Sequence, residues 1–128
     1  MKHDAVFVLA MLLTLSSVQG FCEPQPSHLL EELRRNGVKD DAGAHFHLGE
    51  MYFAGWGVKK DYAEVLKWWQ LAAAEGSAEA QNGLGVLYEY GLGVSQDYAQ
   101  ARDWYSKACD NGLSRGCDNY KKLKAAGY

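Results

Sequence analysis

The sequence predicts an all-α fold in which helix pairs stack into a solenoid, and three observations support this prediction. Residues 44–76 and 80–112 align without a gap at an offset of 36 residues, which indicates a structural repeat. Each segment contains two apolar stripes at helical spacing. Glycines and N-capping residues recur between the stripes, so each unit is predicted to be a helix, a turn and a second helix.

Length and composition are typical of one folded domain. The chain has 128 residues, of which 48% are hydrophobic and only two are proline. The net charge is −3 and no stripe of Lys and Arg is present, so nucleic acid is not an expected partner. We interpret the mild acidity as a contribution to solubility.

Residues 1–20 are predicted to be a signal peptide, because an apolar stretch over residues 5–15 precedes small residues and an expected cleavage site after Gly20. Asp4 departs from this pattern. The stretch is shorter than the ~20 residues that span a bilayer, so we expect a secreted or periplasmic protein with no stable membrane span after cleavage. An uncleaved anchor is the alternative. Phe21 is unsuited to precede a lipidated cysteine, so Cys22 is interpreted as a leftover thiol.

The first helix of each unit carries its apolar stripe on one face. The stripe residues are Ala44, Leu48, Met51 and Tyr52, and then Ala80, Leu84, Leu87 and Tyr88. Gly49 and Gly85 lie inside these helices, where glycine costs about 1 kcal/mol relative to alanine. We therefore expect the backbone of a neighbouring helix to approach closely at both positions. The glycine pairs at 55/57 and 91/93 are expected to end these helices.

The second helix of each unit is expected to begin after Asp61 and Asp97. Each aspartate is followed three residues later by Glu or Gln, which is a capping-box pattern, and its charge suits the helix dipole. The apolar stripes that follow are Val65, Trp68, Trp69 and Ala72, and then Ala101, Trp104, Tyr105 and Ala108. The expected helix ends, with the caps of the next helices, are Gly76 with Ser77 and Gly112 with Ser114.

Two units bury too little surface for a stable solenoid, so the flanks are expected to complete it. Residues 27–35 and 114–126 are each predicted to form one further helix, and Lys121, Lys122 and Lys124 give the last one a polar outer face. The predicted organisation is a signal peptide (1–20), an N-terminal capping helix (21–43), repeat 1 (44–79), repeat 2 (80–113) and a C-terminal capping helix (114–128).

The repeated pattern resembles the Sel-1-like repeat. The resemblance is most specific in L-G-x-x-Y followed by G-x-G-V and D-Y, and it is firm over residues 44–112 and loose in the flanks. Val65 departs from it, because the family prefers the alanine that Ala101 supplies in the second unit. The resemblance implies a right-handed superhelix of helix pairs, similar to tetratricopeptide repeats, that acts as a scaffold for protein assembly.

Cys109 and Cys117 are expected to form a disulfide bond. They lie at the end of one predicted helix and the start of the next, and the chain folds back between them. Their C-x7-C spacing also resembles the bridges of the Helicobacter cysteine-rich proteins, which are secreted Sel-1-like repeat proteins. Such a loop would contribute about 2.5 kcal/mol in the chain-entropy model. Two buried free thiols are the alternative, and no metal site is expected at this spacing.

No catalytic constellation and no cofactor are predicted. The resemblance to the Helicobacter proteins raises β-lactamase activity, but no serine is followed three residues later by the lysine that S-x-x-K requires. His45 and His47 lie about 200° apart around a helix axis, so they cannot share a metal ion, and both are interpreted as solvated. The alternative function is a hydrolase or binder of β-lactams or cell-wall peptides.

A protein or peptide partner is expected to bind a groove lined by the first helices, as the tetratricopeptide resemblance implies. The candidate groove residues differ between the units, and they are Phe46, Glu50, Phe53, Asn82, Val86, Glu89 and Tyr90. Their aromatic rings would anchor a peptide and their carboxylates would orient it. The alternative is that these rings pack against neighbouring helices. Trp56 is a further candidate contact, and the residues expected in the core are Trp68, Trp69 and Trp104.

Overall fold

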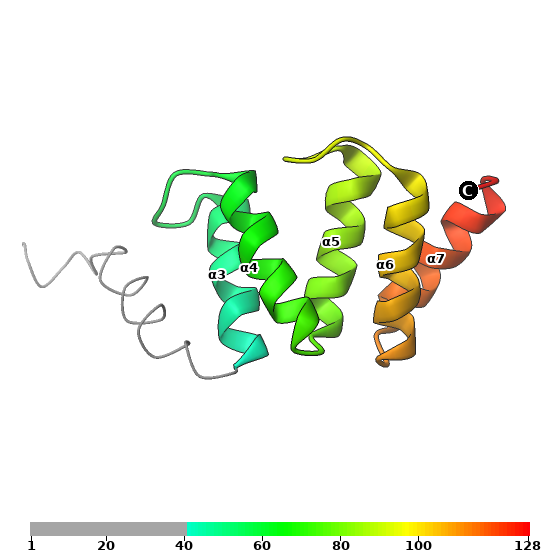
Figure 1. Ribbon diagram of the computed structural model, residues 1–128, viewed down its shortest axis with the longest axis horizontal. Helices are drawn as coiled ribbons and strands as arrows, with labels where there is room; N and C mark the ends of the chain where they lie inside the picture. The colour runs from blue at the N-terminus through cyan, green and yellow to red at the C-terminus, as the bar shows by residue number, and fades with distance from the viewer. Residues whose placement is uncertain (1–40) are drawn as a thin grey trace, which may run out of the picture.

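The structure, a computed structural model, describes residues 41–128 as five helices without a strand in this range (Figure 1). They are α3 (Ala42–Ala54), α4 (Tyr62–Ala74), α5 (Ala78–Tyr90), α6 (Tyr98–Asp110) and α7 (Ser114–Ala125). The predicted signal peptide, the helix predicted over residues 27–35 and Cys22 lie outside the described residues.

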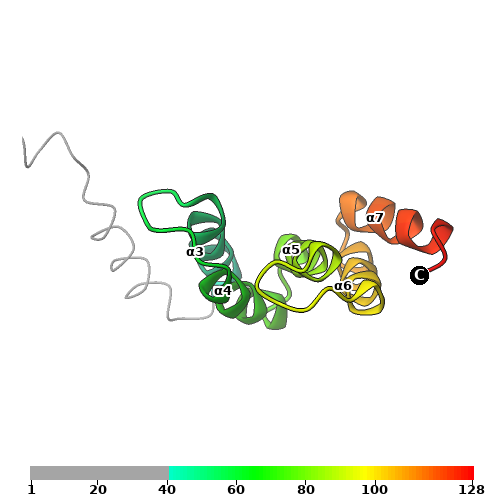
Figure 2. The same ribbon diagram turned by 90° about the horizontal axis from the view of Figure 1, so that it is seen from above.

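The helices form two layers. Figure 2 shows α3, α5 and α7 along one side of the molecule, and α4 and α6 along the other. Each helix packs on the next one in the sequence, and α5 also contacts α7. Short turns at residues 75–77 and 111–113 lie at one end of the stack, and longer loops at residues 55–61 and 91–97 lie at the other (Figure 1). The predicted all-α solenoid of helix pairs is confirmed.

Asp61 and Asp97 begin α4 and α6, as the sequence predicts. The carboxylate of Asp61 accepts two backbone N–H groups of the first turn, at 3.0 and 3.4 Å, and that of Asp97 accepts one at 3.1 Å. In a capping box, the carboxylate of Glu64 would accept the backbone N–H of Asp61. Here it accepts the indole N–H of Trp68, at 3.1 Å, so Glu64 contacts the core instead.

The predicted cap is correct at Ser77 and wrong at Ser114. The hydroxyl of Ser77 accepts a backbone N–H of α5 at 3.2 Å, whereas α7 begins after Leu113, which makes no side-chain cap. The cause is the preceding helix end. After Gly76 and Gly112, which have φ of 94° and 93°, the next N–H returns to a carbonyl of the last helical turn at 3.0 Å. This motif places Leu113 where Ser77 lies in the first repeat.

Trp69 joins three helices of the stack. It extends from α4, and its indole ring fills the space that side chains at Gly49 of α3 and Gly83 of α5 would occupy. Tyr105 of α6 covers Gly85 of α5 in the same way. The close approach predicted at Gly49 and Gly85 is therefore present, but an aromatic ring makes it and not a helix backbone.

The core follows the predicted stripes with few exceptions. The stripe residues that are buried are Leu48, Met51, Val65, Trp68, Trp69, Ala72, Ala80, Leu84, Leu87, Ala101, Tyr105 and Ala108. The remaining stripe residues are half-buried, and they are Ala44, Tyr52, Tyr88 and Trp104. Leu123 of α7 closes the core at the C-terminal end, and the three predicted lysines of that helix are exposed.

His45 is buried, so the expectation that it is solvated is wrong. Its ring stacks on that of Trp68, with centroids 5.6 Å apart, and its Nδ1 lies 3.0 Å from a carboxylate oxygen of Glu75. The equivalent residues of the second repeat form the same link, because the side chain of Asn111 donates to that of Gln81 at 2.7 Å. Each repeat thus ties the start of its first helix to the end of its second.

Candidate binding groove

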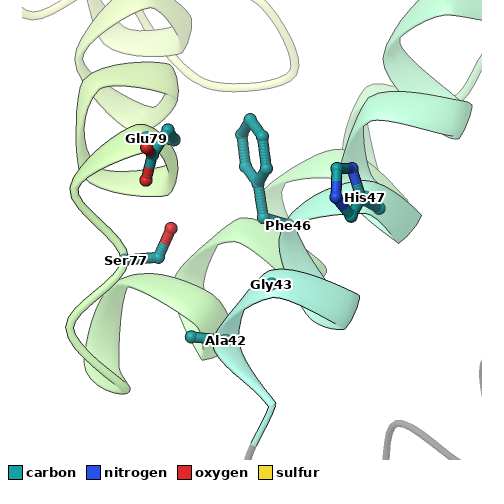
Figure 3. A pocket seen from close by; sticks show the side chains of 6 residues that line it. All are labelled: Ala42, Gly43, Phe46, His47, Ser77 and Glu79. Atoms are coloured by element: carbon teal, nitrogen blue, oxygen red, sulfur yellow. The ribbon is translucent and has the colours of Figure 1, made fainter.

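A groove of about 380 Å³ lies between α3 and α5 on the layer that α7 continues. The residues that line it are Phe46, Glu50, Phe53, Ala54, Trp69, Glu79, Asn82, Gly83, Val86 and Arg115. A second hollow adjoins it near the start of α3 and shares Phe46 and Glu79 with it. Figure 3 shows the ring of Phe46 projecting between His47 of α3 and the start of α5, where Ser77 caps the helix and Glu79 lies in its first turn.

The structure brings five of the seven predicted groove residues together, and they are Phe46, Glu50, Phe53, Asn82 and Val86. Glu89 and Tyr90 lie outside the lining. The carboxylate of Glu89 accepts the hydroxyl of Tyr105, and Tyr90 is 60% exposed. Trp56, the further candidate, is 72% exposed and also lies outside the groove.

Three stacked rings form the aromatic layer of the groove, namely Phe46, Phe53 and Trp69. The ring centroids of Phe46 and Phe53 lie 5.9 and 5.5 Å from that of Trp69, at interplanar angles of 22° and 26°. The indole N–H of Trp69 donates to the backbone carbonyl of Phe46 at 3.1 Å, which holds the central ring in place. Both phenylalanines therefore pack on a neighbouring helix and also line the groove.

Sequence reasoning missed four lining residues with a part in the site, namely Trp69, Glu79, Gly83 and Arg115. The tetratricopeptide resemblance points only to the first helix of each unit, whereas Trp69 reaches the groove from α4. Gly83 offered a signal, because it has no glycine counterpart at His47 in the first repeat. No local pattern indicated Arg115, which α7 brings to the groove from the next unit.

Charge in the groove is unevenly distributed. Glu50 of α3 and Glu79 of α5 stand on opposite walls, and both are exposed. The carboxylate of Glu50 lies 2.9 Å from Nδ1 of His47, which is exposed as predicted. Glu79 makes no side-chain hydrogen bond or ion pair within residues 41–128. Arg115 supplies the opposite charge from α7, so two carboxylates face the groove against one guanidinium.

The space between α5 and α7, the next two helices of the same layer, is bridged by a hydrogen bond between side chains. The side chain of Asn119 donates to that of Asn82 at 2.9 Å, and the two helices are in contact. Beneath them, Tyr105 is held by its hydrogen bond to Glu89. Burial, together with the bond to Glu89 and its negative charge, raises the pKa of Tyr105.

The structure joins the sulfur atoms of Cys109 and Cys117, whose Cα atoms lie 4.5 Å apart. Gly116 permits this approach. A Cβ at that position would lie 2.9 Å from the backbone nitrogen of Cys109 and 2.7 Å from the Cβ of Ala108. The start of α7 is therefore pressed against the last turn of α6, a contact that cysteine spacing alone did not reveal.

Within residues 41–128, no group of three or more His, Cys, Asp or Glu side chains is arranged to hold a metal ion. None of the described helices combines the length and apolar character that crossing a membrane requires.

The groove and the stacked helix pairs define a helical repeat protein, and comparison with known proteins gives its family. The Sel1 repeat model matches residues 42–77 and 78–113, so the chain belongs to the Sel1 repeat family. Sel1 repeats serve as scaffolds for protein–protein interaction. No curated protein matches the chain.

Two solved structures are similar to the chain. A Sel1 repeat protein from Oxalobacter formigenes is 32% identical with a TM-score of 0.71, over 77% of this chain and 40% of that one. The protein c5321, described as a protective antigen present in uropathogenic Escherichia coli strains displaying an SLR fold, is 32% identical with a TM-score of 0.74. That match covers 90% of this chain and 25% of that one, so this chain spans less than half the length of either relative.

Proposed function

We propose that this protein is an exported scaffold that binds a segment of another protein in the groove between α3 and α5. The observation that carries the proposal is the aromatic layer of Phe46, Phe53 and Trp69, which lines the groove and is fixed before any partner arrives. A preorganised surface binds without the entropic cost of ordering its side chains. Aromatic residues are also common among the residues that dominate binding energy at interfaces.

The space between α3 and α5 differs from the space between α5 and α7, and this difference supports the choice of groove. The interval between α5 and α7 is bridged by Asn82 and Asn119, whereas the walls between α3 and α5 stand apart over the ring of Trp69. A partner segment entering there can bury apolar surface against three rings. The polar residues of the rim, Glu50 and Glu79, would then orient it.

Export to a secreted or periplasmic compartment is part of the proposal. The predicted signal peptide over residues 1–20 supports it. The pairing of Cys109 with Cys117 is consistent with it, because disulfides persist in oxidising compartments and are rare in the cytosol. We propose that the bridge is formed in the exported protein and holds α7 in place.

Affinity capture from the exported fraction tests the groove. The wild-type protein is compared with the double variant Phe46→Ala/Phe53→Ala and with Val86→Lys, which places a long cationic side chain on the opposite wall and leaves the ring stack intact. We expect both variants to lose the captured partner. Trp56→Ala is the matched control, because this exposed ring lies outside the groove and its removal should leave capture unchanged.

Circular dichroism melting of each variant shows whether it is folded. Retention of every partner by folded Val86→Lys and by the double variant would show that the groove is not the binding surface.

Binding rather than catalysis is proposed, and the alternative of β-lactam hydrolysis has a direct test. Turnover of nitrocefin by the purified protein, absent from a mock purification, would overturn this part of the proposal. We expect no turnover above the mock purification.

A further inference from the structure

We infer that the groove selects its partner by a basic side chain, an arginine or lysine, that enters between Glu50 and Glu79 and lays its stem along the aromatic layer. This inference rests on the proposed function and specifies the chemistry of the bound segment. It follows from the placement of the two carboxylates, from the rings between them and from the hydrogen bonds that these groups make.

The two carboxylates approach the groove from opposite walls. Glu50 lies between Phe46 and Phe53 in the sequence of α3, and these three residues line the groove together at i, i+4 and i+7. Glu79 lies in the first turn of α5, across the groove. Two like charges beside one groove repel each other, and a single cation between them is attracted by both. The carboxylate of Glu79 makes no hydrogen bond or ion pair within residues 41–128, so it is available to a ligand.

The aromatic layer suits the rest of a basic side chain. Guanidinium and ammonium groups are attracted to the faces of aromatic rings, and the guanidinium group also stacks on them. The methylene stem of arginine or lysine buries apolar surface while its charged end stays near solvent. An acidic segment would meet two carboxylates of its own sign. A purely apolar segment would shield Glu79 from water without giving it a partner, which is costly.

Arg115 carries the charge opposite to that of Glu50 and Glu79, so its removal should change the binding affinity in the opposite direction. Its guanidinium lines the groove from α7 and repels a basic side chain that enters there. Neutralising Glu79 should therefore weaken binding, whereas neutralising Arg115 should strengthen it. His47, the other titratable group beside Glu50, lies in the adjoining hollow and not in the groove itself.

The experiment uses the mature full-length protein and an array of short immobilised peptides with a randomised central residue. We expect arginine and lysine to be enriched at the centre of the bound peptides. The affinity of the protein for the best arginine peptide is then compared with its affinity for the analogue in which citrulline replaces the arginine, which keeps the shape and removes the charge. The analogue should bind about two- to fivefold more weakly, and the difference should shrink at high salt, as for an exposed ion pair.

The same arginine peptide is titrated against four variants. Glu50→Gln and Glu79→Gln should each weaken binding about two- to fivefold, and Arg115→Gln should strengthen it. Asp110→Asn is the matched control, because this exposed carboxylate at the end of α6 lies outside the groove, and its removal should change affinity least.

The outcomes separate this inference from the proposed function. One outcome would support the groove and overturn the basic side chain. In it, the bound peptides lack a central basic residue, bind Glu50→Gln and Glu79→Gln as well as wild type, and are lost with Val86→Lys. Peptide binding that no groove variant affects would overturn both. An array on which no peptide binds would likewise count against both.

Discussion

The indole ring of Trp69 lies over Gly83 so closely that no side chain fits between them. A Cβ at position 83 would lie 2.7 Å from the Cε3 and Cζ3 atoms of the ring. Because Trp69 belongs to α4 and Gly83 to α5, this contact joins the first repeat to the second. The same ring supports the groove from below, so stacking of the repeats and the shape of the site depend on one residue pair.

Substitution of Gly83 should therefore be costly. We expect Gly83→Ala to lower the free energy of unfolding by about 1–3 kcal/mol, because the indole or the helix must move to admit one methyl group. Gly43→Ala is the control, since this glycine is exposed in the first turn of α3 and a Cβ there would meet only the end of the exposed Asp41 side chain, at 3.2 Å. Urea denaturation of both variants measures the effect. Equal stability of the two would contradict the contact.

The two serines that follow α4 and α6 should respond differently to truncation. Ser77→Ala removes the only side-chain cap of α5 and should cost about 1 kcal/mol of unfolding free energy. Ser114→Ala should cost less than this, because the hydroxyl caps nothing and alanine is a good helix former. Thermal melts of the two variants under one condition give the comparison. A larger loss in Ser114→Ala would place the cap of α7 where the sequence predicted it.

This serine pair shows how far the sequence predicts the fold. Asp61, Asp97 and Ser77 act within one turn of chain, so local chemistry was sufficient to place them. At Ser114 the residue type pointed to a cap, but the 36-residue register had already assigned that position to Leu113. The repeat register predicts the start of α7 better than residue type does. The reason is that the turn ending α6 fixes the backbone of Leu113 as the N-cap, whichever side chain follows it.

The site was less predictable than the fold, for a physical reason. Helical spacing identifies which residues share a face, and it correctly grouped Phe46, Glu50 and Phe53. It does not indicate which side chain from another helix will fill the space between two faces. Trp69 enters through gaps left by glycines, and His45 was misjudged because its partner, Glu75, lies 30 residues away in the sequence.

Tyr105 should make stability depend on alkaline pH. The pKa of Tyr105 is raised in the folded state, chiefly by burial and then by Glu89, so its contribution is fully present below the ordinary tyrosine pKa of about 10. It is lost as the pH rises above that value, because the unfolded chain then releases the proton more readily. Tyr105→Phe lacks this titration and also loses the hydrogen bond to Glu89.

The measurement is the difference in unfolding free energy between wild type and Tyr105→Phe as a function of pH. At neutral pH the variant should be less stable by about 1 kcal/mol. Above about pH 10 the gap should narrow. A gap that stays constant or widens there would contradict the raised pKa.

Reduction should loosen the C-terminal end of the stack. Opening the bridge between Cys109 and Cys117 should cost about 2.5 kcal/mol of unfolding free energy, because the unfolded chain regains its freedom. Hydrogen exchange in α7 should rise more than in α4. Cys109→Ser/Cys117→Ser is the control, since reductant should no longer change its stability. Peptide mapping by mass spectrometry identifies the pair, and detection of both residues as free thiols in the exported protein would contradict the bridge.

The disulfide between Cys109 and Cys117 also determines how the protein unfolds when its C-terminal end is pulled. With the sulfur atoms joined, residues 109–117 form a closed ring around the turn between α6 and α7. A pull on the C-terminal end can unravel α7 only back to Cys117. Beyond that point the force passes through the sulfur atoms to Cys109 in the last turn of α6, and the turn itself carries none of it. Extension must then continue from Cys109 into α6, where Tyr105 and Ala108 are buried.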